Sequence, residues 1–146
     1  MRLSICLAAL AATAALAACV PVDTRPHPIL TDRGNRVQPT GNPGEFEVLT
    51  RPGDAGAQLW CAAGEYAESQ TDARPSDRIY LVHPRGPSAS HPGRKSAIFT
   101  VRPDAELLAQ ARALPDQIVL GVSRVGSNWA RIHAQQVCRP LFNLPD

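Results

Sequence analysis

The chain has 146 residues, with 15 basic and 13 acidic side chains and a formal net charge of +2. A balance so near neutrality gives no support to nucleic-acid binding, because proteins of that class usually gather a basic excess on one face. The length accommodates one domain with a modest core. We therefore expect a single small domain and no nucleic-acid partner.

The first nineteen residues are the most distinctive part of the chain. Arg2 precedes an alanine-rich apolar run over residues 3–16, which leads into Leu16-Ala17-Ala18-Cys19. A short positive end, an apolar run of about 7 to 15 residues and small residues before a cleavage point characterise a signal peptide. The box Leu16-Ala17-Ala18-Cys19 resembles that of bacterial lipoproteins. This resemblance implies a signal peptide over residues 1–18, cleavage before Cys19, and a lipid on that cysteine.

The lipoprotein resemblance also implies a cellular location. It places the chain in the cell envelope, attached to a membrane through the lipid on Cys19. Val20 stands where enteric lipoproteins retained in the inner membrane carry aspartate, which favours the outer membrane and a domain facing the periplasm. Two alternatives remain open: Ala15-Leu16-Ala17 also fits the pattern of ordinary secretion, and residues 3–20 approach the roughly 20 residues that a transmembrane helix needs.

Residues 19–43 are predicted to be a lipidated N-terminus followed by a tether. The segment is polar and rich in proline, a composition that favours extended chain without a core of its own. At about 3 Å per residue, such a tether would hold a domain up to about 70 Å from the membrane. Ile29-Leu30 could instead pack against the domain as an irregular strand.

The folded domain is expected over residues 44–146. Residues 45–49 alternate between apolar and polar side chains, which predicts a half-buried strand. Apolar residues at helical spacing then predict a helix from a cap at Asp54 to about Gln70. The small residues of this segment indicate close packing against a sheet.

Two further strands and a short helix are expected in the middle of the chain. Residues 78–82 and 96–101 are rich in β-forming side chains and predict an antiparallel hairpin joined by a long loop over residues 83–94. Pro103 and Asp104 then begin a short helix, which Pro115 ends.

The last third of the chain is predicted to hold a central strand. Residues 117–125 form the most apolar segment after the signal peptide, and residues 129–137 fit strand first and a helical turn near Cys138. The expected fold class is α+β, with a small, mainly antiparallel sheet, one longer helix and one short helix.

The four cysteines divide by position if the lipoprotein resemblance holds. Cys6 leaves with the signal peptide and Cys19 takes the lipid, so Cys61 and Cys138 remain. Two such cysteines in an oxidising compartment usually pair, and neither belongs to a C-x-x-C motif for redox exchange or zinc. We predict that a Cys61–Cys138 disulfide closes the domain. Residues 60–66 and 122–141 also resemble small exported bacterial proteins of unassigned function, which implies no catalytic residue.

No catalytic, metal or cofactor site is predicted. His83 and His91 flank the proline-rich loop without the spacing of a strong metal site. Ser88 and Ser90 lack the G-x-S-x-G pattern of a hydrolase. His133 could serve as an acid or base, but no identifiable nucleophile or paired carboxylate lies beside it in the sequence.

Trp129 and His133 are the candidates for contact with an envelope protein partner, because exposed aromatic side chains often anchor such partners. The chain has only seven aromatic residues and needs most of them for its core, so a core position is the favoured alternative for Trp129. The sequence favours a membrane-anchored binding or assembly module. A small exported enzyme or inhibitor, with a site formed only in three dimensions, is one alternative, and a cleft joining His133 to carboxylates would favour it. An accessory subunit of a secretion or surface-appendage complex is another.

Overall fold

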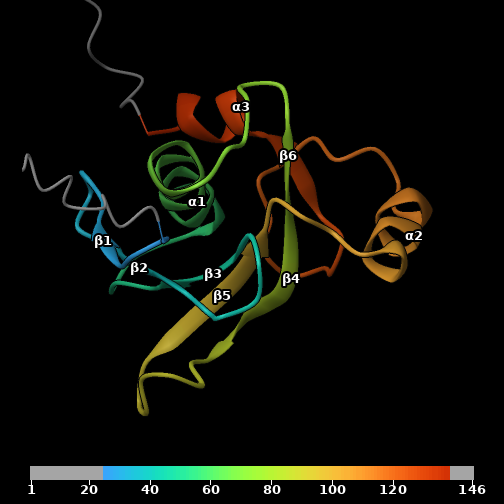
Figure 1. Ribbon diagram of the computed structural model, residues 1–146. Coiled ribbons are helices and arrows are strands. Elements are labelled where there is room, and N and C mark those ends of the chain that lie inside the picture. Colours follow the sequence, from blue (N-terminus) through green and yellow to red (C-terminus); the bar gives the residue numbers. More distant parts are fainter. Residues whose placement is uncertain (1–24, 139–146) are drawn as a thin grey trace, which may run out of the picture.

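The computed structural model describes residues 25–138, and within them one antiparallel sheet runs in the order β1-β2-β3-β5-β4-β6 (Figure 1). Its strands are β1 (Ile29–Leu30), β2 (Arg36–Pro39), β3 (Glu45–Leu49), β4 (Arg78–Pro87), β5 (Lys95–Thr100) and β6 (Asn128–Ala130). The helices are α1 (Gly56–Gln70), α2 (Ala105–Ala113) and the short α3 (Arg131–Gln136). The expected α+β class, with a small antiparallel sheet and one longer helix, is confirmed. Cys19 and the expected signal peptide lie outside the described residues.

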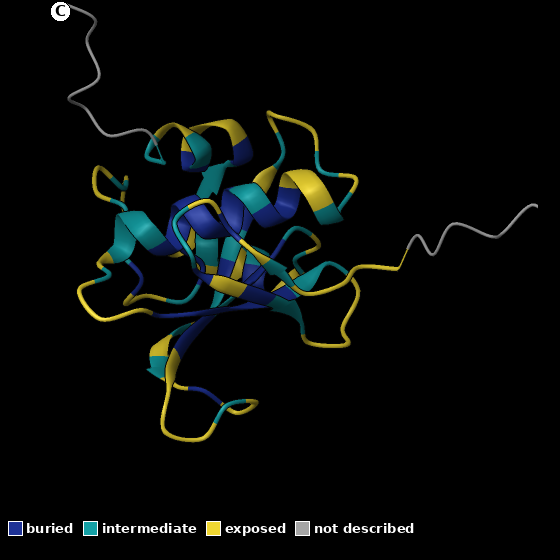
Figure 2. Cartoon of the chain, turned by 90° about the vertical axis from the view of Figure 1, so that its left-hand side faces the viewer, coloured by how far each residue is buried: buried dark blue, intermediate teal, exposed yellow. Residues whose placement is uncertain are grey.

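The core lies between α1 and one face of the sheet. Phe46 of β3 packs on Tyr66 of α1 with ring centroids 4.5 Å apart, and Phe99 of β5 meets Trp60 edge-on at 4.8 Å. These rings are almost completely buried, and the dark blue stretch of α1 in Figure 2 marks the same face. Aromatic pairs of this kind add about 0.5 to 1.5 kcal/mol beyond the area that they bury.

Helix α3 lies against α1 and closes the other side of that helix (Figure 1). Gly64 permits the contact, because a β-carbon there would lie 3.0 Å from the backbone nitrogen of Gln135. The disulfide between Cys61 and Cys138 joins the two helices, with Cα atoms 4.9 Å apart. The predicted pairing of these cysteines is confirmed.

The segment assigned to the tether contains two strands of the sheet, so the boundary expected at residue 44 is wrong. Val37 of β2 is fully buried and pairs with Val48 of β3. Gly34, at a φ of 80°, turns the chain between β1 and β2, and Asn35 donates to the Leu49 carbonyl at 3.2 Å. Pairing with a neighbouring strand supplied the stability that composition alone did not indicate. Ile29-Leu30 does form an edge strand, as the alternative allowed.

Helix α1 ends where the sequence predicts but begins without the expected cap. Its N-cap residue is Ala55, and Gln58 accepts a hydrogen bond from the Ala55 backbone nitrogen at 3.0 Å. Asp54 instead accepts from the backbone of Arg51 at 2.7 Å and from Asn35 at 2.6 Å. Asp104 caps α2 as predicted, accepting from the Leu107 backbone nitrogen at 2.8 Å.

The hairpin of β4 and β5 forms as predicted, but β4 is longer than expected. It continues through His83 to Pro87, and its pairing with β5 shifts register on both sides of His83. Local irregularities of this kind let a strand accommodate residues that a regular ladder excludes. The loop is therefore confined to residues 88–94.

The central strand expected over residues 117–125 is wrong. This stretch contains neither helix nor strand, and Ile118 and Val119 are 91% and 67% exposed. The sheet is already filled by β3 and β5 at its centre. Residues 128–136 follow the predicted order of strand and then helix, although the helix begins at Arg131, before the turn expected near Cys138.

Candidate functional site

A depression lies where the C-terminal end of α1 meets residues 25–27 and the turn between β2 and β3. It has two adjoining parts, a helix-end hollow of about 630 Å³ and a Tyr66 hollow of about 510 Å³ under residues 39–45. Sites for small ligands usually measure about 300 to 1,000 Å³, so each part has the size of a binding site. The walls of both parts include Arg25, Pro26, Pro43, Gly44 and Thr71.

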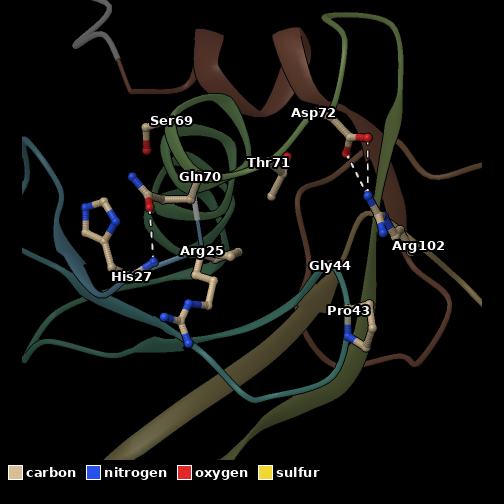
Figure 3. A pocket seen from close by; sticks show the side chains of 10 residues that line it. Arg25, His27, Pro43, Gly44, Ser69, Gln70, Thr71, Asp72 and Arg102 are labelled. Carbon is tan, nitrogen blue, oxygen red and sulfur yellow. Dashed lines mark hydrogen bonds and ion pairs between the residues drawn. The ribbon is translucent and has the colours of Figure 1, made fainter. Parts of the chain in front are cut away.

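The helix-end hollow has charged groups at its rim (Figure 3). Arg102 pairs with Asp72 at 3.2 Å, and both side chains are more than half exposed. On the other side, Gln70 accepts a hydrogen bond from the backbone of His27 at 3.1 Å, and Arg25 lies between these two pairs. An ion pair this exposed contributes about 0 to 1 kcal/mol to stability. Breaking the pair so that Arg102 contacts another partner would therefore cost little free energy.

Gly44 fixes the rim beside Arg102. Its φ of 72° favours glycine, and a β-carbon there would lie 2.8 Å from Cγ of Arg102. The carbonyl of Gly44 accepts from the backbone of Val101 at 3.0 Å. The rim is therefore held by backbone bonds and by the close approach of Arg102.

The Tyr66 hollow combines apolar walls with one unpaired polar group. Pro26, Pro39 and Pro43 line it. The Tyr66 hydroxyl is buried and has no hydrogen-bond partner among the described residues. Burial raises the pKa of Tyr66 to about 12, so the phenol stays protonated and able to donate at neutral pH.

A second polar cluster surrounds Glu47 on the sheet face opposite the core. The loop of residues 88–94 folds over this carboxylate, which is 3% exposed. Ser88 donates to it at 2.6 Å, and Ser90 and Gln38 donate to its other oxygen. His91 contacts Ser90 through Nδ1 at 2.8 Å. Sequence reasoning missed this cluster, because its members are up to 53 residues apart and match no motif.

The Glu47 cluster is built to hold a charge and not to move a proton. Burial alone would raise the pKa of Glu47, but hydrogen bonds from Ser88, Ser90, Ser96 and Gln38 together outweigh burial and lower that pKa. A general base near neutral pH needs the opposite shift. The carboxylate therefore serves to fasten the β4–β5 loop to the sheet.

Replacing Glu47 by glutamine should lower the free energy of unfolding at pH 7 by about 1 to 3 kcal/mol, the usual worth of hydrogen bonds to a charged group. Because the folded pKa lies below the unfolded value of about 4.3, the stabilisation is complete above that value and is lost as pH falls through the folded pKa. Urea unfolding at pH 7 and pH 3.5 should show the gap between wild type and Glu47→Gln shrinking in acid. The exposed Glu106→Gln is the matched control, and a gap independent of pH would contradict this role.

A third cluster surrounds the disulfide. Arg33, in the turn between β1 and β2, donates to the Cys138 carbonyl at 3.0 and 2.7 Å. Glu65 accepts from the backbone of Asp32 at 2.9 Å, and its pKa is raised mainly by burial. The nearly buried Arg131 pairs with Glu68 at 2.8 Å. These contacts tie α3 and the N-terminal hairpin to α1, a structural role.

Trp129 and His133 lie together, as expected of a shared surface, but they differ in burial. Their ring centroids are 4.8 Å apart, with His133 exposed and Trp129 half-buried against the core. The indole Nε1 of Trp129 is buried with no partner among residues 25–138. The tryptophan is thus mainly a packing residue, and only His133 presents a free edge.

The remaining sequence candidates do not converge. His83 is exposed on β4, whereas His91 belongs to the Glu47 cluster. Within the described residues, the group of potential metal ligands found is Cys61, Glu65 and Cys138, and its two sulfurs are bonded to each other. The Tyr66 hollow is the arrangement best suited to holding a ligand.

Comparison with known proteins finds no relative of this chain. No protein-family model, curated protein or solved structure matches the chain. Within residues 25–138, no helix is long and apolar enough to cross a membrane.

Proposed function

We propose that the chain is a lipid-anchored binding module of the bacterial cell envelope, attached through Cys19 to the outer membrane and facing the periplasm. The sequence Leu16-Ala17-Ala18-Cys19 supports the anchor. The depression at the end of α1 supports the binding role. An envelope protein or a small molecule presented by such a protein would be its partner.

The observation that carries the proposal is that residues in the wall of the depression lie close to Cys19 in sequence. Arg25 and Pro26 form part of its wall, and Arg25 follows Cys19 by only six residues. Six extended residues span about 20 Å. A lipid on Cys19 would therefore keep the depression close to the membrane surface, far nearer than the tether of about 70 Å expected from composition.

Replacing Cys19 by serine should abolish incorporation of an alkyne-tagged fatty acid and leave an uncleaved precursor or a soluble product. The serine hydroxyl lacks the nucleophilic thiolate that receives the lipid. Labelling in a Gram-negative host followed by detergent extraction measures both effects. Cys6→Ser is the matched control and should keep the label, because it lies in the segment to be removed. Undiminished labelling of Cys19→Ser would contradict the anchor.

A further inference from the structure

Four exposed cationic side chains surround the turn between β3 and α1. They are Arg51, Arg85, Arg94 and Lys95. Arg85 donates to the Asp54 carbonyl at 2.7 Å, and Arg94 donates to the Thr50 carbonyl at 3.2 Å. The carbonyl of Lys95 accepts from the Thr50 backbone nitrogen at 2.8 Å. We call these four side chains the basic surface.

The basic surface keeps its positive charge. Within residues 25–138, none of its four members forms an ion pair with a carboxylate. The hydrogen bonds of Arg85 and Arg94 go to neutral carbonyls, and so does that of Arg51, which donates to Arg33. A carbonyl does not neutralise a guanidinium, and each arginine retains further N–H donors. The basic surface can therefore attract an anion without the loss of an ion pair.

Few acids oppose this charge. The sequence contains no acidic residue between Asp77 and Asp104, the stretch that supplies three of the four cations. Two acids lie near the turn. Glu47 is 3% exposed and holds the β4–β5 loop, and the Asp54 carboxylate accepts hydrogen bonds at 2.6 and 2.7 Å. Both carboxylates are thus held by donors of the fold itself, and the cations outnumber them.

Two exposed apolar side chains lie beside the basic surface. Ile118 is 91% exposed and Val119 is 67% exposed. Their loop crosses the N-terminal end of α1, where the Leu120 carbonyl lies over the first turn of the helix. Two residues further on, the Val122 carbonyl accepts from the Arg85 backbone nitrogen at 3.0 Å. Aliphatic side chains this exposed contribute little burial to the fold, so they are free to enter another apolar phase.

Cations beside exposed aliphatic side chains are typical of a site that binds a membrane surface. Such binding grows with the apolar area that enters the bilayer and with attraction to anionic headgroups. The proposed lipid on Cys19 would keep a bilayer within reach at a high effective concentration. The bilayer is therefore favoured over a dissolved acidic partner.

The length of α1 lets the anchor and the basic surface meet one bilayer. The helix has 15 residues and is about 22 Å long at 1.5 Å per residue. Arg25 lies in the wall of the hollow at its C-terminal end, whereas the basic surface lies at its N-terminal end. The six residues from Cys19 to Arg25 span about 20 Å when extended, which leaves room for α1 to lie along the membrane.

We propose that the basic surface, together with Ile118 and Val119, is a second contact of the chain with its membrane and binds anionic phospholipid. The two aliphatic side chains would enter the boundary of the acyl chains, and the four cations would contact headgroup phosphates. This inference rests on the proposed anchor and adds an orientation to it. The domain lies along the bilayer, and the β4–β5 hairpin, which extends beyond the rest of the sheet in Figure 1, faces the headgroups.

Quenching by brominated acyl chains measures this contact, because it reaches only indoles that enter the apolar part of a bilayer. The protein is the full chain with Ile118→Trp, extracted from a Gram-negative host and placed in nanodiscs of brominated lipid. The wild type supplies the background of Trp60 and Trp129. Phosphatidylglycerol in the nanodisc should raise the ratio of docked to undocked chains at least about tenfold over phosphatidylcholine alone.

Ala109→Trp, on an exposed position of α2, is the matched control and should not be quenched. An acidic protein as the true partner of the basic surface would leave Ile118→Trp unquenched in both lipids, which would overturn the proposal. Equal quenching of Ile118→Trp in the two lipids, or equal quenching of Ala109→Trp, would also overturn it.

Lys95→Gln, combined with Ile118→Trp, removes one charge at the start of β5. It should lower the ratio of docked to undocked chains about fivefold in phosphatidylglycerol nanodiscs, because one cation near an anionic surface is worth about that factor. High salt should lower the ratio as well. Arg112→Gln, exposed on α2, is the matched control and should leave the ratio unchanged. Equal effects of the two substitutions, or no effect of Lys95→Gln, would contradict the proposal.

The two proposals fail separately. Absence of the lipid label from the wild-type chain would end the anchor hypothesis, whatever the quenching shows. A labelled, anchored chain whose Ile118→Trp indole stays unquenched would end the second membrane contact alone.

Discussion

Replacing both Cys61 and Cys138 by serine is expected to lower the free energy of unfolding by about 4.5 kcal/mol. The two residues are 77 apart in sequence, and closing a loop of that length removes about this much chain entropy from the unfolded state. A domain of this size is typically stable by about 5 to 15 kcal/mol. Urea unfolding at pH 7 measures the difference, and the variant should be partly unfolded at low denaturant.

The wild-type chain treated with dithiothreitol is the matched control for this prediction. It should unfold at the same urea concentration as the double variant, because both lack the cross-link. Hydrogen exchange should rise first in α3, because loss of the disulfide removes its covalent link to α1. Non-covalent contacts such as the pair of Arg131 with Glu68 then remain. A double variant as stable as the oxidised wild type, or alkylation of both Cys61 and Cys138 in unreduced denatured protein, would contradict the role given to the disulfide.

Gly56→Ala is expected to cost about 2 to 4 kcal/mol, although alanine usually favours a helix over glycine by about 0.5 to 1 kcal/mol. A β-carbon on Gly56 would lie 1.9 Å from the carbonyl oxygen of Leu120. The loop over residues 115–127 would have to move, and with it the hydrogen bond of 3.1 Å from the Trp60 indole to the Gly121 carbonyl. Urea unfolding followed by tryptophan fluorescence reports both changes.

Gly121→Ala is the matched control for Gly56→Ala. It lies in the same contact, but a β-carbon there meets nothing within 4 Å, and its φ is not positive. Its stability should remain within about 0.5 kcal/mol of wild type. Equal losses in the two variants would show that the loop does not pack on α1 as described.

The elements that the sequence predicts well are those with a strong local pattern. The alternation of residues 45–49 and the helical spacing up to Gln70 correspond to β3 and α1, and Asp104 caps α2 through its own backbone neighbour. The disulfide followed from the number of cysteines left after the lipoprotein resemblance was applied. For β3, α1 and the cap of α2, the decisive pattern involves residues that are near in sequence. For the disulfide, only one pairing of the remaining cysteines was possible.

The errors arise where pairing partners decide the structure. Val37 belongs to a polar, proline-rich segment, yet its place beside Val48 makes β2 a strand. Residues 117–125 are apolar enough for a central strand, but Ile118 and Val119 are exposed because other strands fill the sheet. The Tyr66 hollow combines residues from three separated segments. No local sequence pattern predicts an unpaired hydroxyl or a wall built from such separated segments.

The proposed lipid anchor at Cys19 is tested most directly by the intact mass of the chain extracted from membranes. Wild-type protein from a Gram-negative host should have the mass of residues 19–146 plus a diacylglyceryl modification, less two hydrogens for the Cys61–Cys138 disulfide. A chain that retains residues 1–18, or one cut elsewhere without added lipid, would contradict the proposal of a binding domain held at the membrane surface.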